Sequence, residues 1–164
     1  MKYILTAEQM READEFAIGR AGIPSITLME RAGAALADEA EDMCPQGDIV
    51  VVCGGGNNGG DGFVCARVLR ERGRSAAVVC IADRMTEECR ISRNKFEKAG
   101  GEVFSVFPRR RFALAVDCLF GTGFHGEPTG KSAAAIDYVN SVAEKVLAAD
   151  VPSGMSGTDG RAAR

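Results

Sequence analysis

The sequence predicts a doubly wound α/β fold, in which a mostly parallel sheet lies between helices in a three-layer, Rossmann-like αβα arrangement. Short, nearly continuous apolar runs such as residues 76–81 alternate with segments of helical spacing, a pattern typical of parallel strands buried on both faces. A glycine-rich segment, residues 54–62, separates the first such strand from the helix after it. Two extra helices are expected at the N-terminus, ahead of this alternating region.

The elements can be assigned in chain order. Thr6 to Gln9 fits a capping box and should begin a helix that runs to about Arg20. Residues 21–24 break this helix, and a second one is expected over residues 25–43. Beyond it, the sequence predicts strands at 48–53, 76–81, 102–106, 112–118 and 145–151, and helices at about 62–72, 86–99 and 131–143.

Length and composition set the class of protein. The 164 residues suit one domain, residues 1–164, large enough to bury about 70% of its unfolded surface. No apolar element follows the last predicted strand, so we expect this domain to be incomplete at its C-terminal end. A net charge of −3 argues against a nucleic-acid binder, which would present a basic face.

The cysteines and the apolar segments bear on the compartment. None of the six cysteines forms a CxxC pair, so neither a zinc site nor a disulfide framework is expected, and free buried thiols suit a reducing cytosol. The N-terminus lacks a signal-peptide core, and no apolar run is long enough to cross a bilayer. The sequence therefore predicts a soluble, cytoplasmic protein without a membrane partner.

The glycine-rich segment is the most informative motif. Six glycines among residues 54–62 predict a loop whose N–H groups a ligand can approach closely. Asn57, Asn58 and Asp61 add side-chain oxygens. No Lys-Ser/Thr pair follows, which excludes a Walker A loop. A Gly-x-Gly-x-x-Gly dinucleotide fingerprint matches only weakly, although Asp83 lies beyond the second strand, where a ribose-binding acid would be.

Two other strand ends carry polar motifs. Residues 117–124 follow the fourth strand and residues 150–154 follow the last. Each alone could be a turn or helix cap, but parallel strands bring their carboxyl ends to one edge of the sheet. Asp117, Asp150 and Ser153 would then join the glycine segment in a site rich in oxygen donors, which suits a hard cation beside an anionic ligand.

These motifs resemble the YjeF N-terminal domain, the NAD(P)H-hydrate epimerase family. The resemblance covers nearly the whole chain, in order. It rests on Gly-Gly-Asn-Asn-Gly-Gly-Asp-Gly-Phe at 55–63, Val-Asp-Cys-Leu-Phe-Gly-Thr-Gly at 116–123, Ala-Asp-Val-Pro-Ser-Gly at 149–154, and the helical segments 5–14 and 28–33.

The resemblance implies an isomerase that interconverts the R and S epimers of hydrated NADH or NADPH. A partner dehydratase that uses ATP or ADP, in some proteins fused behind this domain, would then repair the S form to the normal dinucleotide. Homodimer formation is left open. A potassium ion would be held by Asn58, Asp117 and Ser153. The dinucleotide would contact Asn57, Asn58, Gly59, Gly60, Asp61, Gly121, Thr122, Gly123, Phe124, His125, Gly126, Glu127 and Asp150.

Epimerisation requires proton transfer at or near the hydrated carbon, and carboxylates are the candidates. Asp117 is the predicted catalytic residue because it ends a central strand facing the glycine segment, whereas Asp150 is placed to hold a ribose. The N–H groups of residues 57–60 and 121–123 are predicted to bind the pyrophosphate. Gly59→Val is expected to abolish this binding without unfolding the domain.

Two other functions remain as alternatives. A catalytically inactive nucleotide- or protein-binding module of the same fold is favoured by the short C-terminus, since family members continue through a strand that brings a lysine towards the site. On that ground this 164-residue form is expected to bind the dinucleotide but to epimerise poorly. An NAD-dependent dehydrogenase rests on the glycine fingerprint alone. Intact Asn58, Asp117 and Asp150 favour the epimerase.

Overall fold

The fold is built on one five-stranded parallel sheet. The computed structural model describes residues 6–124, 126–157 and 159–162. The strands are β1 (Ile49–Cys53), β2 (Ala76–Cys80), β3 (Val103–Phe104), β4 (Phe112–Cys118) and β5 (Ala143–Ala148), and they lie in the order β3-β2-β1-β4-β5. All four pairings are parallel. The order reverses between β1 and β4, which is where ligands bind in open sheets of this kind.

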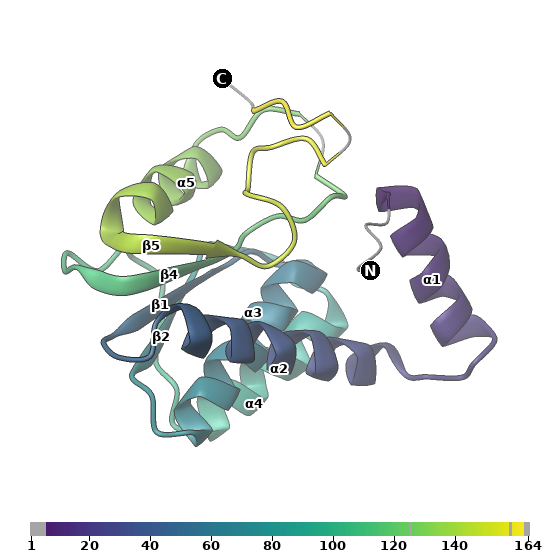
Figure 1. Ribbon diagram of the computed structural model, residues 1–164, viewed down its shortest axis with the longest axis horizontal. Helices are drawn as coiled ribbons and strands as arrows, with labels where there is room; N and C mark the ends of the chain where they lie inside the picture. Colours follow the sequence, from purple (N-terminus) through teal and green to yellow (C-terminus); the bar gives the residue numbers. More distant parts are fainter. Residues whose placement is uncertain (1–5, 125, 158, 163–164) are drawn as a thin grey trace.

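Helices cover both faces of the sheet, as the sequence predicts. Helices α2 (Ser25–Met43), α3 (Asn57–Glu71) and α4 (Glu87–Lys98) lie on one face, and α5 (Lys131–Val142) lies on the other (Figure 1). Side chains that alternate along each central strand point to opposite faces. Two hydrophobic clusters result, one under α2 to α4 and one under α5. The doubly wound, three-layer prediction is confirmed.

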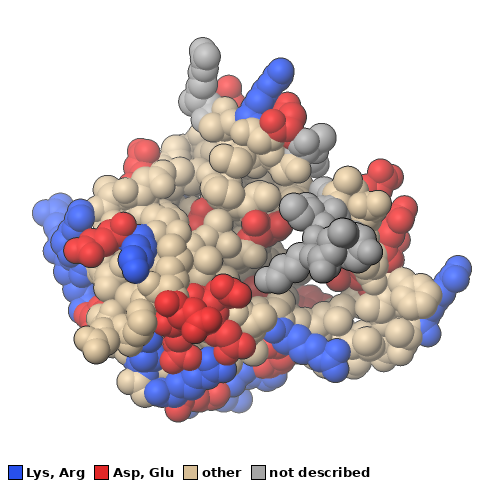
Figure 2. Space-filling model, viewed as in Figure 1, with Lys and Arg blue, Asp and Glu red and all other residues tan. Residues whose placement is uncertain are grey.

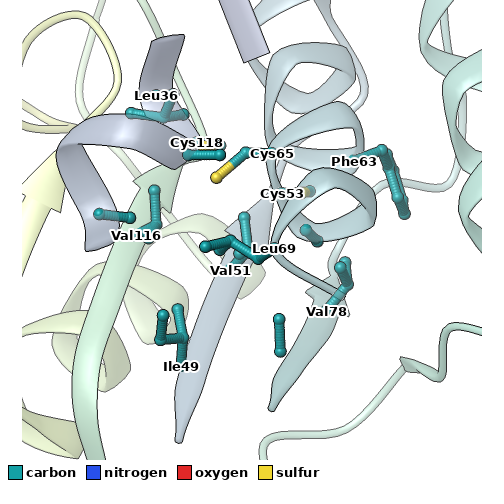
Figure 3. Close-up of a cluster of buried hydrophobic side chains, with 14 of the residues drawn as sticks. Leu36, Ile49, Val51, Cys53, Phe63, Cys65, Leu69, Val78, Val116 and Cys118 are labelled. Carbon is teal, nitrogen blue, oxygen red and sulfur yellow. The ribbon is translucent and has the colours of Figure 1, made fainter. Parts of the chain in front are cut away.

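The larger cluster is a close-packed core. Leu36 from α2, Cys65 from α3 and Val51 and Val116 from the sheet gather in the space between helices and strands (Figure 3). All six cysteines are buried and free, as predicted. Burial raises the pKa of the Cys65 thiol to about 12, so this thiol stays protonated and acts as a small apolar group.

Helix α1 (Ala7–Gly19) differs from the other helices in its packing. Its capping box is present, because Thr6 Oγ1 accepts from Gln9 N at 3.2 Å and Gln9 Oε1 accepts from Thr6 N at 2.9 Å. The helix stands apart from the α/β body (Figure 1). Its apolar residues Phe16 and Ile18 remain 58% and 45% exposed. Within the described residues, no helix has the length and apolar composition needed to cross a bilayer.

The glycine-rich segment departs from the predicted loop. Helix α3 begins at Asn57, so Gly59, Gly60 and Gly62 lie inside its first turns. Close packing explains why glycines stand there. A Cβ at Gly59 would overlap the carbonyl oxygen of Gly54, and one at Gly62 would lie 2.7 Å from Cys53 Sγ. Glycine is unfavourable inside a helix, but only glycine lets this helix approach β1 and β4 so closely.

The sheet edges also differ from the prediction. β3 has only two residues. β5 begins at Ala143 and ends at Ala148; its residues 144–146 are exposed and the others are only partly buried. Asp150 therefore follows the last strand and does not lie in it. An edge strand needs only one buried face, so its apolar pattern is weaker than that of β1 or β2.

Candidate functional site

The register of the sheet brings three strand ends to one level. Cys53 of β1 pairs with Cys80 of β2 and with Cys118 of β4, and Asp117 pairs with Ala148 of β5. The segments that follow these strands surround a cavity of about 700 Å³, here called the main cavity. It is lined by Met10, Asp14, Gly55, Gly56, Asn57, Asn58, Asp61, Thr86, Leu119, Phe120, Gly121, Thr122, Gly123, Phe124, Ala149 and Asp150.

The N-terminus of α3 forms one wall of the main cavity. Gly56 is the N-cap and supplies no side-chain cap. The first intrahelical donor here is Gly60, which donates to Gly56 O at 3.0 Å, so the preceding N–H groups of the first turn have no helical acceptor. Asn58 Nδ2 is buried and has no hydrogen-bond partner. Free amides at the positive end of a helix favour an anion.

Asp117 and Ser153 form a buried pair beside the main cavity. Asp117 Oδ2 accepts from Ser153 N at 2.8 Å, and Oδ1 accepts from Ser153 Oγ at 2.7 Å and from Leu119 N at 3.1 Å. Phe120 N donates to Ser153 Oγ at 3.1 Å. Asp117 is only 5% exposed. These bonds tie the segment after β4 to the turn after β5.

Asp150 holds the glycine turn after β4. Its Oδ2 accepts from Thr122 N at 2.7 Å. A Cβ at Gly121 would lie 2.6 Å from the same oxygen, which is too close for any residue but glycine. Phe120 and Phe124 stack on this turn with ring centroids 4.2 Å apart. The turn therefore presents a backbone edge and an aromatic surface to the main cavity.

The main cavity is acidic. Asp14, Asp61 and Asp150 line it, and no lysine or arginine stands among its described lining residues. Figure 2 shows carboxylate groups in the hollow between α1 and the α/β body. Desolvation by burial, with smaller contributions from Asp14 and Asp150, raises the pKa of Asp61 to about 7. Asp61 is therefore a carboxyl group that exchanges protons near neutral pH.

The structure gathers most of the predicted dinucleotide-binding residues around the main cavity. Asn57, Asn58, Asp61, Gly121, Thr122, Gly123, Phe124 and Asp150 line it. Gly59 and Gly60 are buried inside α3, Gly126 and Glu127 line a neighbouring cavity of about 340 Å³, and His125 lies outside the described residues. The contacts of all these residues with a dinucleotide stay predictions.

The expectation that Gly59→Val would leave the fold intact conflicts with the packing. A side chain at this position would collide with the backbone of Gly54, at the end of β1, so the substitution would disturb the connection between β1 and α3. The same collision means that lost binding in this variant would not by itself identify a ligand contact.

Sequence reasoning missed several lining residues. Met10 and Asp14 come from α1, and Thr86 is the N-cap of α4, where its N–H donates to Gly55 O at 2.9 Å. The Thr86-x-x-Cys89 cap was visible in the sequence as a helix start. No local pattern shows that α1 contributes residues to this cavity, because that placement depends on the arrangement of distant parts of the chain.

The predicted donor set is rich in oxygen atoms. Asn58, Asp117 and Ser153 offer amide, carboxylate and hydroxyl oxygens, and Asp117 is buried without an ion pair to any described lysine or arginine. Hard oxygen donors favour a hard cation. Asp117 and Ser153 meet, but no hydrogen bond joins Asn58 to either of them. Their role as a potassium site stays a prediction.

Curated relatives resemble this chain over nearly its full length. It is 34% identical over 168 residues to the NAD(P)H-hydrate epimerase of Lentilactobacillus buchneri, covering 98% of this chain and 77% of that protein. It is 33% identical over 164 residues to the NAD(P)H-hydrate epimerase of Rhodopirellula baltica, covering 95% and 67%. The bifunctional NAD(P)H-hydrate repair enzyme Nnr of Moorella thermoacetica is 35% identical over 175 residues, but this chain spans only 33% of it.

A solved structure shares the fold. The crystal structure of yeast YNL200c superposes with a TM-score of 0.82 at 23% identity, over 94% of this chain and 72% of that one. The family model described as YjeF-related protein N-terminus matches residues 25–164. The chain belongs to this YjeF-related N-terminal family.

Proposed function

We propose that this protein is an NAD(P)H-hydrate epimerase, which interconverts the R and S epimers of hydrated NADH or NADPH. The main support is one juxtaposition: the N–H groups that begin α3, which have no acceptor within the helix, and an acid with a pKa of about 7 lie at the same cavity, at the strand-order reversal. The first binds a pyrophosphate and the second transfers protons. Relatives that bear the name epimerase support the same assignment.

The pyrophosphate would lie against α3 and the glycine turn. The N–H groups of Asn57, Asn58 and Gly59 and those of Gly121 and Gly123 would supply donors without a lysine, whereas the Thr122 N–H already donates to Asp150. The carboxylates around the main cavity oppose an anion, so a cation is needed for balance. Asn58, Asp117 and Ser153 would hold a potassium ion that supplies this positive charge.

Inverting the hydrated carbon requires a bond from that carbon to oxygen or nitrogen to break and form again. An acid protonates the departing heteroatom, and a base takes the proton back when the bond re-forms. Asp61 is present in both protonation states at neutral pH and lines the main cavity, so this side chain suits both steps. Asp117, predicted from the sequence to be catalytic, has three hydrogen bonds that suit it to holding the site together.

The test starts from one purified epimer of the NADH hydrate, and chromatography then follows the appearance of the other epimer above the uncatalysed rate. Asp61→Asn should lower the catalysed rate by about 10² to 10⁴, with a smaller loss in affinity. Asp48→Asn is the matched control, because Asp48 precedes β1 at the opposite edge of the sheet and pairs with Arg110. An active Asp61→Asn together with an inactive Asp117→Asn would return the catalytic role to Asp117.

A dehydratase is the proposed functional partner. The Moorella thermoacetica relative is named as a bifunctional repair enzyme, which links this domain type to a second repair activity in one chain. Adding an ATP- or ADP-dependent hydrate dehydratase should let the mixture consume both epimers, with the R epimer consumed at the rate set by this protein. If the wild-type chain binds the hydrate but never speeds epimerisation, it is a binding module of this fold.

A further inference from the structure

A second cavity at the same edge of the sheet contains positively charged side chains, which the main cavity lacks among its described lining residues. This edge cavity, about 230 Å³, lies where β2 and β3 end. Its lining includes Asp83, Arg93 and Lys131 and the apolar residues Ile81, Phe104 and Phe107. Lys131 and Arg93 bring two positive charges to it and Asp83 brings one negative charge. It is too small for a whole dinucleotide but suits one nucleoside end of such a ligand.

Two segments of the chain contribute residues to both cavities, although no described residue lines both. The connection after β2 lines the edge cavity with Ala82 and Asp83 and the main cavity with Thr86. The segment after β4 lines the main cavity with residues 119–124 and reaches the edge cavity at Lys131. Gly55, which lines the main cavity, packs closely on the connection after β2, because a Cβ on Gly55 would lie 2.9 Å from Ala82 Cβ and would overlap Arg84 O. A ligand that occupied both cavities would lie along this edge of the sheet, across Gly55 and the connection after β2.

Asp83 and Lys131 face each other as an open ion pair. Lys131 Nζ lies 2.9 Å from Asp83 Oδ1 and 3.2 Å from Oδ2. The side chain of Asp83 is 82% exposed and that of Lys131 is 69% exposed. Ion pairs this exposed add little stability, so either partner can turn to a ligand at small cost. Arg93 stands on α4 beside them and pairs with Glu97 through its Nε at 3.0 Å.

We propose that the edge cavity binds the adenosine ribose of the substrate and reads its 2′ position with this ion pair. Asp83 accepts a hydrogen bond from the 2′-hydroxyl of the NADH form. Lys131, with Arg93, binds the 2′-phosphate of the NADPH form. In folds of this type the acid beyond the second strand meets the ribose, and a nearby cation accommodates a 2′-phosphate. The inference rests on the proposed function for the identity of the ligand.

Opposite charges in one cavity explain how it could serve both forms. A carboxylate alone would repel a 2′-phosphate, and a lysine alone would offer no acceptor to a hydroxyl. Here each form takes one partner of the pair and leaves the other. The apolar walls from Ile81, Phe104 and Phe107 provide a surface for the base.

The test uses two probes that differ only at the 2′ position, 5′-AMP and adenosine 2′,5′-bisphosphate, titrated into the 164-residue chain by calorimetry. Asp83→Asn should lower the affinity for 5′-AMP by about fivefold and leave the affinity for the bisphosphate unchanged or higher. Lys131→Gln should weaken the bisphosphate by about tenfold and change 5′-AMP by less than about twofold. Asp48→Asn, which removes a carboxylate from another exposed pair, should change neither.

The decisive result is a crossed pattern, in which Asp83→Asn weakens mainly the binding of 5′-AMP and Lys131→Gln weakens mainly the binding of the bisphosphate. Equal effects of both substitutions on both probes, no effect of either, or a wild-type chain that binds neither probe would overturn the proposal. Epimerisation of the two hydrates, measured separately, keeps the two claims apart. Crossed binding without epimerase activity retains the subsite and removes the proposed function, whereas activity with uncrossed binding does the reverse.

Discussion

Ser153 donates two hydrogen bonds to the Asp117 carboxylate: its backbone N lies 2.8 Å from Asp117 Oδ2, and its Oγ lies 2.7 Å from Asp117 Oδ1. The same hydroxyl accepts from Phe120 N. Both residues are buried. A single side chain therefore links a strand inside the sheet to two loops at the candidate site.

Ser153→Ala is expected to destabilise the domain. The change removes a hydrogen bond to a buried carboxylate and leaves Phe120 N–H without its acceptor, which should cost about 2 kcal/mol in the free energy of unfolding. Urea denaturation measures this loss. Ser141→Ala is the control, because the Ser141 hydroxyl bonds only to carbonyls of its own helix region. Equal stability of the two variants would show that the Asp117 contact contributes nothing.

Asp61 should make the stability depend on pH. Its folded pKa of about 7 lies above the unfolded value of 3.8, so the folded protein holds this proton more tightly. The stabilisation is complete below about pH 4 and is lost as the pH rises through 7. Asp61→Asn should therefore unfold at a higher temperature than wild type at pH 8 but not at pH 4, in low-salt buffer without nucleotide. A difference independent of pH would contradict the raised pKa.

Two glycines of the same segment should respond differently to substitution. Gly59→Ala places a Cβ against Gly54 O and should cost about 1–3 kcal/mol through overpacking, despite the better helix propensity of alanine. Gly56 has open space around its Cβ position and is the N-cap of α3, so Gly56→Ser should keep or raise the stability. Chemical denaturation compares them. Equal costs would show that the segment yields easily.

The unpaired amide of Asn58 should matter for binding and not for folding. Asn58 Nδ2 is buried without an acceptor, so its removal in Asn58→Ala should leave the stability unchanged or slightly higher. Affinity for a nicotinamide dinucleotide should fall about tenfold if the ligand supplies the acceptor. Asn94→Ala, on the exposed face of α4, is the control. Unchanged affinity would remove Asn58 from the binding site.

Much of this architecture is encoded locally. The apolar runs of β1 and β2 predict their strands because a strand buried on both faces has no polar side to interrupt the run. Thr6 and Gln9 predict the start of α1, because a capping box needs only residues three apart. The polar ends after β1, β4 and β5 follow from the same alternation, since parallel strands deliver their carboxyl ends to one edge.

Tertiary structure decided the rest. Six glycines among residues 54–62 predict a loop from the local sequence, yet a helix begins at Asn57. The helix fits because glycines in its first turns carry no Cβ, and a Cβ there would collide with Gly54, Met29 or Cys118. Asp14 lines the main cavity only because of where α1 lies in the tertiary structure, and its charge helps raise the pKa of Asp61. Nothing in the sequence near Asp83 shows that Lys131, 48 positions away, pairs with it. Local pattern determines which segments form strands and helices, whereas the charges that meet in a cavity depend on packing between segments far apart in the chain.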